Sequence, residues 1–251
     1  MLGAPLVVCA TRQCLPLRLN IDKCGALSFW NPRGNVPVVW ISAIILMLLG
    51  LPAGWAMAII SYRLPERPEP PSKNRLIWLC TASVLIAGLA CVWSAYYGHG
   101  WMVAGFTTLL AWQLLLLALV DAENFWLPDV LTIPLAITGL IANSVLPFPF
   151  GQGWMVSLLS AVLAFSVLWL LALLYKLVRK RKGMGAGDPI LLGAGCAWVG
   201  ITEILSVMLW ASLSALVVVV ILRLARRDID LSTRLPFGTF LSLGIIISWL
   251  F

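Results

Sequence analysis

The sequence is dominated by long runs of apolar residues that follow one another with only short polar breaks. A helix needs about 20 apolar residues to cross a hydrocarbon core of about 30 Å, and runs near that length recur along the chain. Because lipid cannot satisfy free backbone polar groups, such runs must form helices and not the alternating strands of a barrel. With 61% hydrophobic and 11% charged residues, the chain is predicted to be an integral membrane protein.

We therefore expect an all-α polytopic fold of about eight transmembrane helices joined by short loops. The fourth, sixth and eighth of the expected helices are short. The eight expected ranges are 38–60, 76–97, 101–120, 130–146, 154–175, 189–202, 204–222 and 235–251. Residues 37–251 would form the transmembrane domain, with a short Pro-rich loop at 62–75, and residues 1–36 would form an N-terminal extension.

The basic residues fall into four clusters, at 1–36, 63–75, 176–182 and 223–234. With eight crossings the last three clusters lie on one side of the bilayer, which the positive-inside rule makes the cytoplasmic side. Clusters beside the membrane are expected to contact lipid headgroups. No basic region interleaved with aromatic residues indicates a nucleic-acid partner.

The chain has only ten acidic residues, and two of them stand at the cytoplasmic ends of apolar runs. Asp121 ends the third expected helix, where the helix dipole disfavours a negative charge. Asp188 begins the sixth and precedes Pro189, a pattern typical of an N-cap, and Asp129 after Pro128 is expected to cap the fourth helix likewise. Asp121 and Asp188 are thus predicted at one membrane depth, where helix packing can bring them together.

Two carboxyl groups within hydrogen-bonding distance cannot both ionise easily, so they share a proton. One then acts as a base toward water while the other polarises a scissile carbonyl. Gly185 and Gly187, just before Asp188, would allow backbone and substrate to approach closely, although glycine-rich turns before helices are common.

Four segments resemble the type 4 prepilin peptidases, a family of polytopic GxGD aspartic proteases. They are "LPAGWAMAIISYRLPERP", "LVDAENFWLPDVLTIPLAITGL", "GMGAGDPILLGAGCAWVG" and "LPFGTFLSLG", in the family's order over roughly residues 50–251. The resemblance implies that Asp121 and Asp188 are the catalytic pair, supported by Gly185, Gly187 and Asp129. It implies cleavage of the basic leader of prepilins or pseudopilins of type IV pili and type II secretion, at the cytoplasmic face of the bacterial inner membrane.

In many family members a second activity methylates the new N-terminus from S-adenosylmethionine, whereas proteolysis needs no cofactor. This sequence departs from the family pattern at three points. The insert with two CxxC pairs is missing, and no other spacing predicts a metal site. Ile190 stands where the family has lysine, and Ala58 where it has asparagine.

The segment from Asp121 to Asp129 holds three acids and no base, although cytoplasmic loops favour Lys and Arg. We expect Glu123 to help dock the cations of a basic leader. Two alternatives stay open: a transporter or ion pathway that uses the same carboxylates, and a catalytically inactive assembly subunit. A transporter would be expected to bury its acids in mid-span and to contain inverted repeats.

Overall fold

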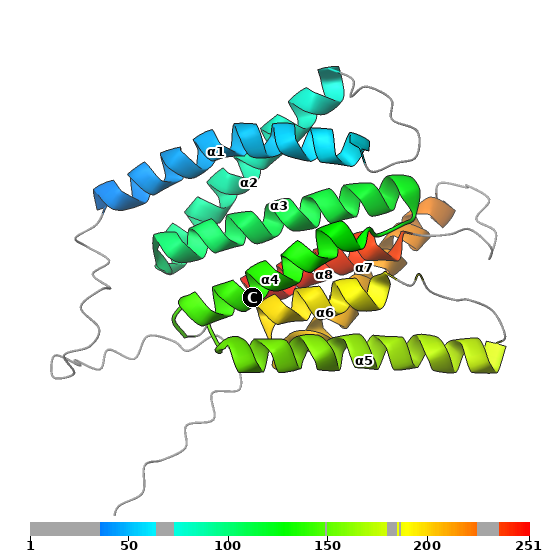
Figure 1. The fold of residues 1–251 in the computed structure, drawn as a ribbon. Helices are drawn as coiled ribbons and strands as arrows, with labels where there is room; N and C mark the ends of the chain where they lie inside the picture. Colours follow the sequence, from blue (N-terminus) through cyan, green and yellow to red (C-terminus); the bar gives the residue numbers. More distant parts are fainter. Residues whose placement is uncertain (1–35, 64–72, 149, 180–184, 186, 225–235) are drawn as a thin grey trace, which may run out of the picture.

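The computed structural model of the chain describes residues 36–63, 73–148, 150–179, 185, 187–224 and 236–251. The expected extension at 1–36 lies almost wholly outside these residues, as does most of the Pro-rich loop at 62–75. The described residues fold into α-helices joined by short turns (Figure 1).

The described ranges contain eight α-helices, which confirms the all-α prediction. A short 3-10 turn, Ile201–Glu203, precedes the seventh. The helices are α1 (Val36–Arg63), α2 (Lys73–Tyr97), α3 (Gly100–Asn124), α4 (Asp129–Val145), α5 (Trp154–Arg179), α6 (Asp188–Val199), α7 (Ile204–Leu224) and α8 (Phe237–Leu250).

Five of these helices, α1, α2, α3, α5 and α7, are long and apolar enough to cross a membrane. The helices α4, α6 and α8 have only 17, 12 and 14 residues, in agreement with the three short runs in the sequence. The chain is therefore a multi-pass membrane protein that combines long apolar helices with three shorter ones.

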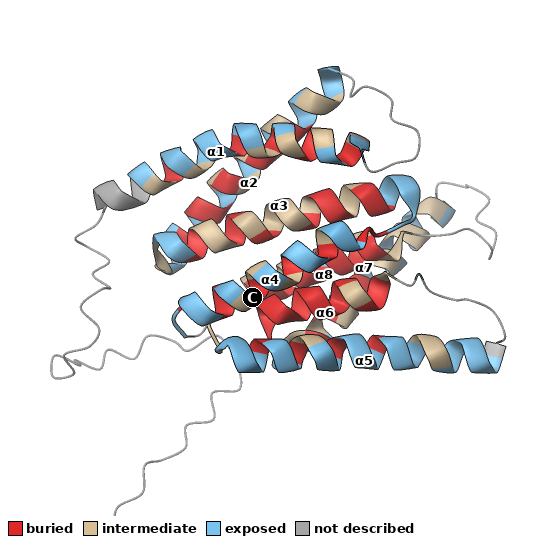
Figure 2. Cartoon of the chain, in the orientation of Figure 1, coloured by how far each residue is buried: buried red, intermediate tan, exposed pale blue. Residues whose placement is uncertain are grey.

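Successive helices run in opposite directions, so the polar connections fall alternately at the two ends of the bundle (Figure 1). The pair α1 and α2 packs together beside α3, and α6 lies between α4, α5 and α8. Figure 2 shows α6 buried along its length, whereas α5 exposes most of its surface. The short helix that begins at Asp188 is thus enclosed by its neighbours.

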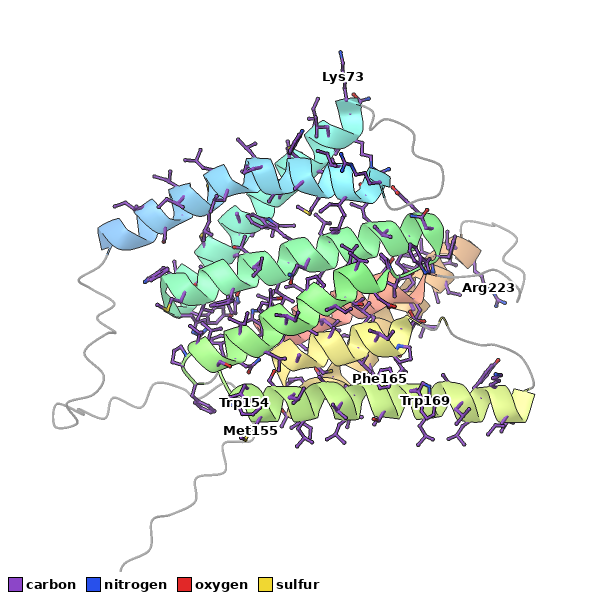
Figure 3. The ribbon with its side chains drawn as sticks, viewed as in Figure 1. Lys73, Trp154, Met155, Phe165, Trp169 and Arg223 are labelled. Atoms are coloured by element: carbon purple, nitrogen blue, oxygen red, sulfur yellow. The ribbon has the colours of Figure 1, made fainter. Side chains whose placement is uncertain are left out.

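The outer surface of the bundle is apolar. The exposed side chains of α5 include Trp154, Met155, Phe165 and Trp169, which Figure 3 labels. A helix that is apolar on its exposed side as well as its buried side is suited to lipid and not to water. The surface therefore agrees with the composition in indicating a bilayer environment.

Two tryptophans fill the centre of the core. Trp198 of α6 and Trp249 of α8 are almost fully buried and meet edge to face, with ring centroids 5.7 Å apart. Each indole N–H has a partner: that of Trp198 donates to the carbonyl of Leu135 at 2.8 Å, and that of Trp249 donates to Thr107 Oγ1 at 2.9 Å. Satisfied N–H groups let these large side chains lie in an apolar interior without a desolvation penalty.

The end of α6 far from Asp188 is tied to its neighbours by polar side chains. Asn143 of α4 donates from Nδ2 to the carbonyls of Ala197 and Trp198, at 2.7 and 3.0 Å. Ser157 of α5 also donates to the carbonyl of Ala197. The last carbonyls of a helix have no partner within it, so these bonds both satisfy them and fix where α6 ends.

Candidate active site

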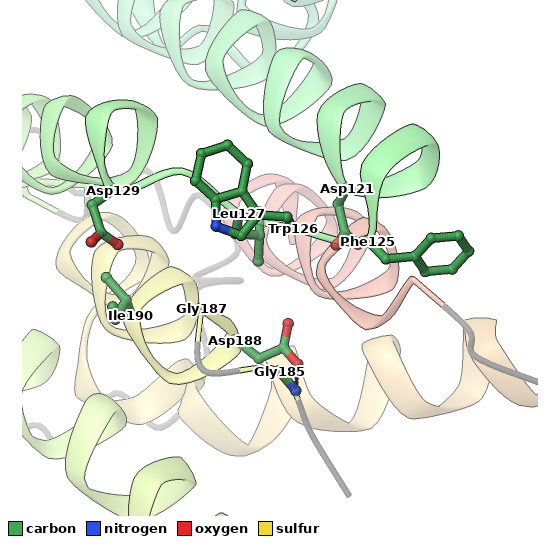
Figure 4. Close-up of a pocket in the computed structure, with 9 residues that line it drawn as sticks. All are labelled: Asp121, Phe125, Trp126, Leu127, Asp129, Gly185, Gly187, Asp188 and Ile190. Carbon is green, nitrogen blue, oxygen red and sulfur yellow. Dashed lines mark hydrogen bonds between the residues drawn. The ribbon is translucent and has the colours of Figure 1, made fainter. Parts of the chain in front are cut away.

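A cavity of about 240 Å³ lies where the end of α3, the segment that follows it, and the start of α6 meet (Figure 4). Its described walls carry three carboxylates and several apolar side chains, and none of the described residues that line it is a lysine or arginine. The residues that line it are Asp121, Phe125, Trp126, Leu127, Asp129, Gly185, Gly187, Asp188 and Ile190.

Asp121 and Asp188 reach this cavity from different helices. Asp121 lies one turn before the end of α3, and Asp188 is the first residue of α6. Both are buried, with exposed fractions of 4% and 5%. The sequence-based expectation that packing brings these two acids together is therefore met in the geometry, while their catalytic roles stay predictions.

Asp121 is held by the first turn of α8. The backbone N–H and the hydroxyl of Thr239 lie 2.8 and 3.2 Å from Asp121 Oδ2. The same hydroxyl lies 3.1 Å from the carbonyl oxygen of Ala118 on α3. A Cβ on Gly238 would come within 2.9 Å of Asp121 Oδ2, so only glycine lets α8 approach this closely.

Asp188 has a less polar environment. Within the described residues its Oδ2 accepts one hydrogen bond, from the backbone N–H of Gly185 at 3.2 Å. Asp188 precedes the apolar run of α6 and lies outside the five long spans. Burial, and then the nearby charge of Asp121, raise the pKa of Asp188 from an ordinary value of 3.8 to about 6, against the smaller opposing effect of the Gly185 N–H.

The two predicted N-cap roles are wrong. The N-cap of α6 is Gly187 and that of α4 is Pro128, and neither position has a side-chain capping bond. Asp188 and Asp129 are each the first residue of their helix. The carboxylate of Asp188 turns back to the N–H of Gly185 and faces the cavity, so it does not satisfy the N–H groups of its own helix.

Leu127 is a buried apolar side chain against which two glycines of the site pack. A Cβ on Gly187 would lie 2.7 Å from Leu127 Cβ, and one on Gly238 would lie 2.8 Å from Leu127 Cδ1. Both glycines thus allow the backbones of α6 and α8 to pack against one buried leucine. The close approach predicted for Gly187 is an approach to Leu127. Gly185 instead supplies an N–H to Asp188.

The turn after α3 has an unusual backbone. Phe125 adopts φ 51°, in the left-handed region, and its N–H donates to the carbonyl of Asp121 at 2.9 Å. This closes α3 one turn after its acid, in the way glycine usually ends a helix. Figure 4 shows the Phe125 ring turned away from Asp188, while Asp129 and Ile190 lie toward the opposite end of the cavity.

Glu123, the predicted docking residue, forms an ion pair. Its Oε2 lies 2.8 Å from Arg75 Nη2 of α2, and both side chains are partly exposed. Arg75 also donates to Ser61 Oγ of α1 at 3.1 Å. This acid therefore links α3 to the α1 and α2 pair, and a substrate cation would have to compete with Arg75 for it.

Thr239, Gly238 and Leu127 are residues of this site that the sequence does not single out. The segment "LPFGTFLSLG" resembles the family as a whole, but nothing in a linear sequence pairs position 239 with Asp121. A glycine next to a hydroxyl residue in the first turn of an apolar helix is the signal that was present. Among the described residues, no group of three or more His, Cys, Asp or Glu side chains is placed to hold a metal ion.

Comparison with known families gives a match to the model of the Type IV leader peptidase family over residues 108–220, the range that contains both buried aspartates. The chain is 35% identical over 215 residues to a prepilin leader peptidase/N-methyltransferase of Pseudomonas aeruginosa. That alignment covers 85% of this chain and 65% of the relative.

Two further relatives bear the same description. The one from Neisseria gonorrhoeae is 39% identical over 134 residues, which cover 52% of this chain and 44% of the relative. The one from Stutzerimonas stutzeri is 35% identical over 150 residues, which cover 59% of this chain and 50% of the relative. The chain thus spans less than two thirds of the length of each of these three relatives. No solved structure matches it.

Proposed function

We propose that this chain is a membrane aspartic endopeptidase, because residues 108–220 match the model of the Type IV leader peptidase family. Its substrates would be type IV prepilins or pseudopilins, from which it removes a basic leader peptide. The names of the three relatives support this substrate class.

One observation carries the proposal: two buried aspartates, contributed by helices far apart in the chain, line one cavity. A buried carboxylate is costly unless it is paired or used, and two of them in one small cavity ionise together less easily than two isolated ones. The pKa of Asp188, raised to about 6, supports a pair that keeps one proton in mildly acidic solution. A pair of this kind can activate water and protonate a peptide carbonyl without a cofactor.

Transport is the second class of function that the acids suggest. A transport site is expected near the middle of the bilayer, between inverted repeats. Asp121 and Asp188 stand instead at the end of α3 and the start of α6, where they line a cavity at one end of the bundle. This position favours a substrate that arrives at the membrane surface, such as the segment between a basic leader and an apolar helix.

Other residues of the cavity would act in support. We assign Gly185 the role of holding Asp188 through its N–H, and Gly187 that of letting α6 close on Leu127. Asp129 would present a carboxylate to the substrate from the far end of the cavity. Glu123 would release Arg75 and bind a cation of the leader peptide instead. If Glu123→Gln left the Michaelis constant for the prepilin unchanged at low salt, this role would be contradicted.

The site would face the cytoplasm in the inner membrane of a bacterium. The ends of α1 and α7 that lie at the aspartate end of the bundle carry Arg63 and Arg223, and α2 begins there with Lys73, as the positive-inside rule predicts for a cytoplasmic face. In a cysteine-free background, Lys73→Cys should resist a membrane-impermeant maleimide in intact cells. Trp154→Cys, at the other end of the bundle, should react. The opposite pattern would reverse the orientation.

Methylation of the new N-terminus is a second candidate activity, because the relatives are named as N-methyltransferases. S-adenosylmethionine would be the methyl donor. The cavity of about 240 Å³ is smaller than the roughly 300–1,000 Å³ of typical small-molecule sites, so it does not fit this donor beside a peptide. We therefore derive no step of methyl transfer from it.

The test is cleavage of a purified prepilin with a basic leader by the reconstituted protein. We expect Asp121→Asn and Asp188→Asn each to lower the rate by at least about 1,000-fold, because each removes one half of the pair. Glu203→Gln, an acid beyond the far end of α6, is the matched control and should retain activity. Cleavage that survives both aspartate changes would rule out the aspartic mechanism, and a labelled methyl donor in the same assay decides the second activity.

A further inference from the structure

The two aspartates differ in the hydrogen bonds that they accept. Asp121 Oδ2 faces two donors of Thr239, the N–H at 2.8 Å and the hydroxyl at 3.2 Å. Among the described residues, Asp188 Oδ2 faces one donor, the N–H of Gly185 at 3.2 Å. Donors aimed at a carboxylate stabilise its ionised form, so the closer and more numerous donors favour the charge on Asp121.

The surrounding charges do not offset this difference. Within the described part of the chain, α8 has no ionisable side chain, α6 contributes Asp188 and α4 contributes Asp129. On the side of α1 and α2, Arg75 is engaged with Glu123, while Arg63 and Lys73 are exposed at helix ends. Among the residues that the structure describes, hydrogen-bond donors are therefore what distinguishes the two carboxyl groups.

We propose that Thr239 is a positioning residue that makes Asp121 the ionised member of the pair and leaves the shared proton on Asp188. The inference rests on the proposed peptidase function and adds a division of labour to it. Asp121 is then the general base toward water, and Asp188 is the acid toward the carbonyl oxygen of the substrate.

The division gives a balanced reaction. As water attacks the peptide carbon, Asp121 takes a proton from it and Asp188 gives its proton to the carbonyl oxygen, which forms a neutral diol. When the C–N bond breaks, Asp121 returns its proton to the leaving amine and Asp188 takes one from a diol hydroxyl. One water is consumed, and both acids regain their starting protonation.

The hydroxyl of Thr239 has a use in both protonation states of Asp121. It carries one hydrogen and has two acceptors within reach, Asp121 Oδ2 at 3.2 Å and the carbonyl oxygen of Ala118 at 3.1 Å. While Asp121 is ionised, the charged oxygen is the stronger acceptor. When Asp121 holds the proton of the attacking water on Oδ1, its Oδ2 still accepts the N–H of Thr239. The hydroxyl can then donate to the carbonyl of Ala118 instead.

The experiment compares Thr239→Val, which keeps the shape and the N–H but removes the hydroxyl, with Thr239→Ser, which keeps the hydroxyl. Thr108→Val is the matched control, because Thr108 is buried on α3 and its hydroxyl donates only to the carbonyl of Ala104 among the described residues. The rate of prepilin cleavage is measured from pH 4 to pH 9, together with Tm.

For Thr239→Val we expect kcat to fall roughly ten-fold, with KM nearly unchanged. The acid limb of the pH profile should move up by about one pH unit, the effect of one lost hydrogen bond to a charged group, and the alkaline limb should move less. Thr239→Ser should restore the wild-type profile, and Thr108→Val should keep it. A fall in rate without movement of the acid limb would show a merely structural role and overturn the inference.

The outcome can be separated from failure of the proposed function. If Asp121→Asn retains cleavage, the aspartic mechanism on which the inference rests is wrong. If Asp121→Asn is inactive while Thr239→Val has a wild-type profile, only the role of Thr239 is wrong. Should Thr239→Val fail to fold, Thr239→Ala removes the same hydroxyl without adding volume, and its acid limb decides in the same way.

Discussion

The aspartates show what function requires of single residues in this protein. Asp188 is buried beside a second acid and has one hydrogen-bond donor, which is an unfavourable place for a charge. Asp121 is equally buried but is held by α8 through Thr239. Two chemically identical side chains thus acquire different properties from the helices that meet them.

The raised pKa of Asp188 has a consequence for stability. The folded protein binds the proton of Asp188 up to about pH 6, whereas the unfolded chain releases it near 3.8. Stability therefore falls as pH rises through this window and stays lowered above it. This change in the pKa of Asp188 lowers the free energy of unfolding by at most about 3 kcal/mol at high pH.

We expect Asp188→Asn to melt at a higher temperature than the wild type at pH 8, because asparagine has no charge to bury. The difference in Tm should shrink toward pH 4.5, where Asp188 is protonated in the folded state. Thermal unfolding in detergent at both pH values measures it. An equal difference at the two pH values would show that ionisation of Asp188 is not the cause.

For single residues, the sequence predicted which acids belong to the site but not which groups their side chains contact. Asp121 and Asp188 stood out because acids are rare in apolar surroundings. The capping roles of Asp188 and Asp129 were wrong, because Asp-Pro and Pro-Asp are generic helix-start patterns and the side chains turn elsewhere. Thr239 contacts an acid more than a hundred residues away, which no local pattern encodes.

Among the elements, the helices were predictable to within a few residues because their lengths are set by apolar runs between polar breaks. Their packing was not predictable. Helices that are apolar on all sides have no polar face to show which side is buried. Packing is decided instead by small residues, as at Gly139 of α4, where a Cβ would lie 2.7 Å from the Trp198 ring.

Gly139 tests how tightly α4 and α6 fit together. Trp198 is fully buried and its N–H is bonded to Leu135, so it cannot move aside. Gly139→Ala is expected to destabilise the protein by about 1–3 kcal/mol through overpacking. Gly105→Ala on α3, where a Cβ meets nothing within 4 Å, is the matched control and should leave Tm unchanged or slightly raised. Equal effects of the two changes on Tm would contradict the close packing of α4 on α6.

At the scale of the whole molecule, the two proposed catalytic residues belong to helices of different kinds. Asp121 is carried by α3, whose 25 residues extend about 37 Å, and Asp188 by α6, whose 12 residues extend about 18 Å. The far end of α6 is bonded to Asn143 and Ser157. A long helix adjusts to the bilayer by tilting, whereas an enclosed short one does not face lipid.

A change in bilayer thickness therefore acts on α3 more than on α6, and it shifts one carboxylate relative to the other. Cleavage in liposomes of short, intermediate and long acyl chains should pass through a maximum, with Tm varying much less than kcat. A rate that is flat across these lipids would mean that α3 and α6 move together. If the maximum is observed, the lipid composition of the membrane controls the rate of cleavage, because the lengths of α3 and α6 differ.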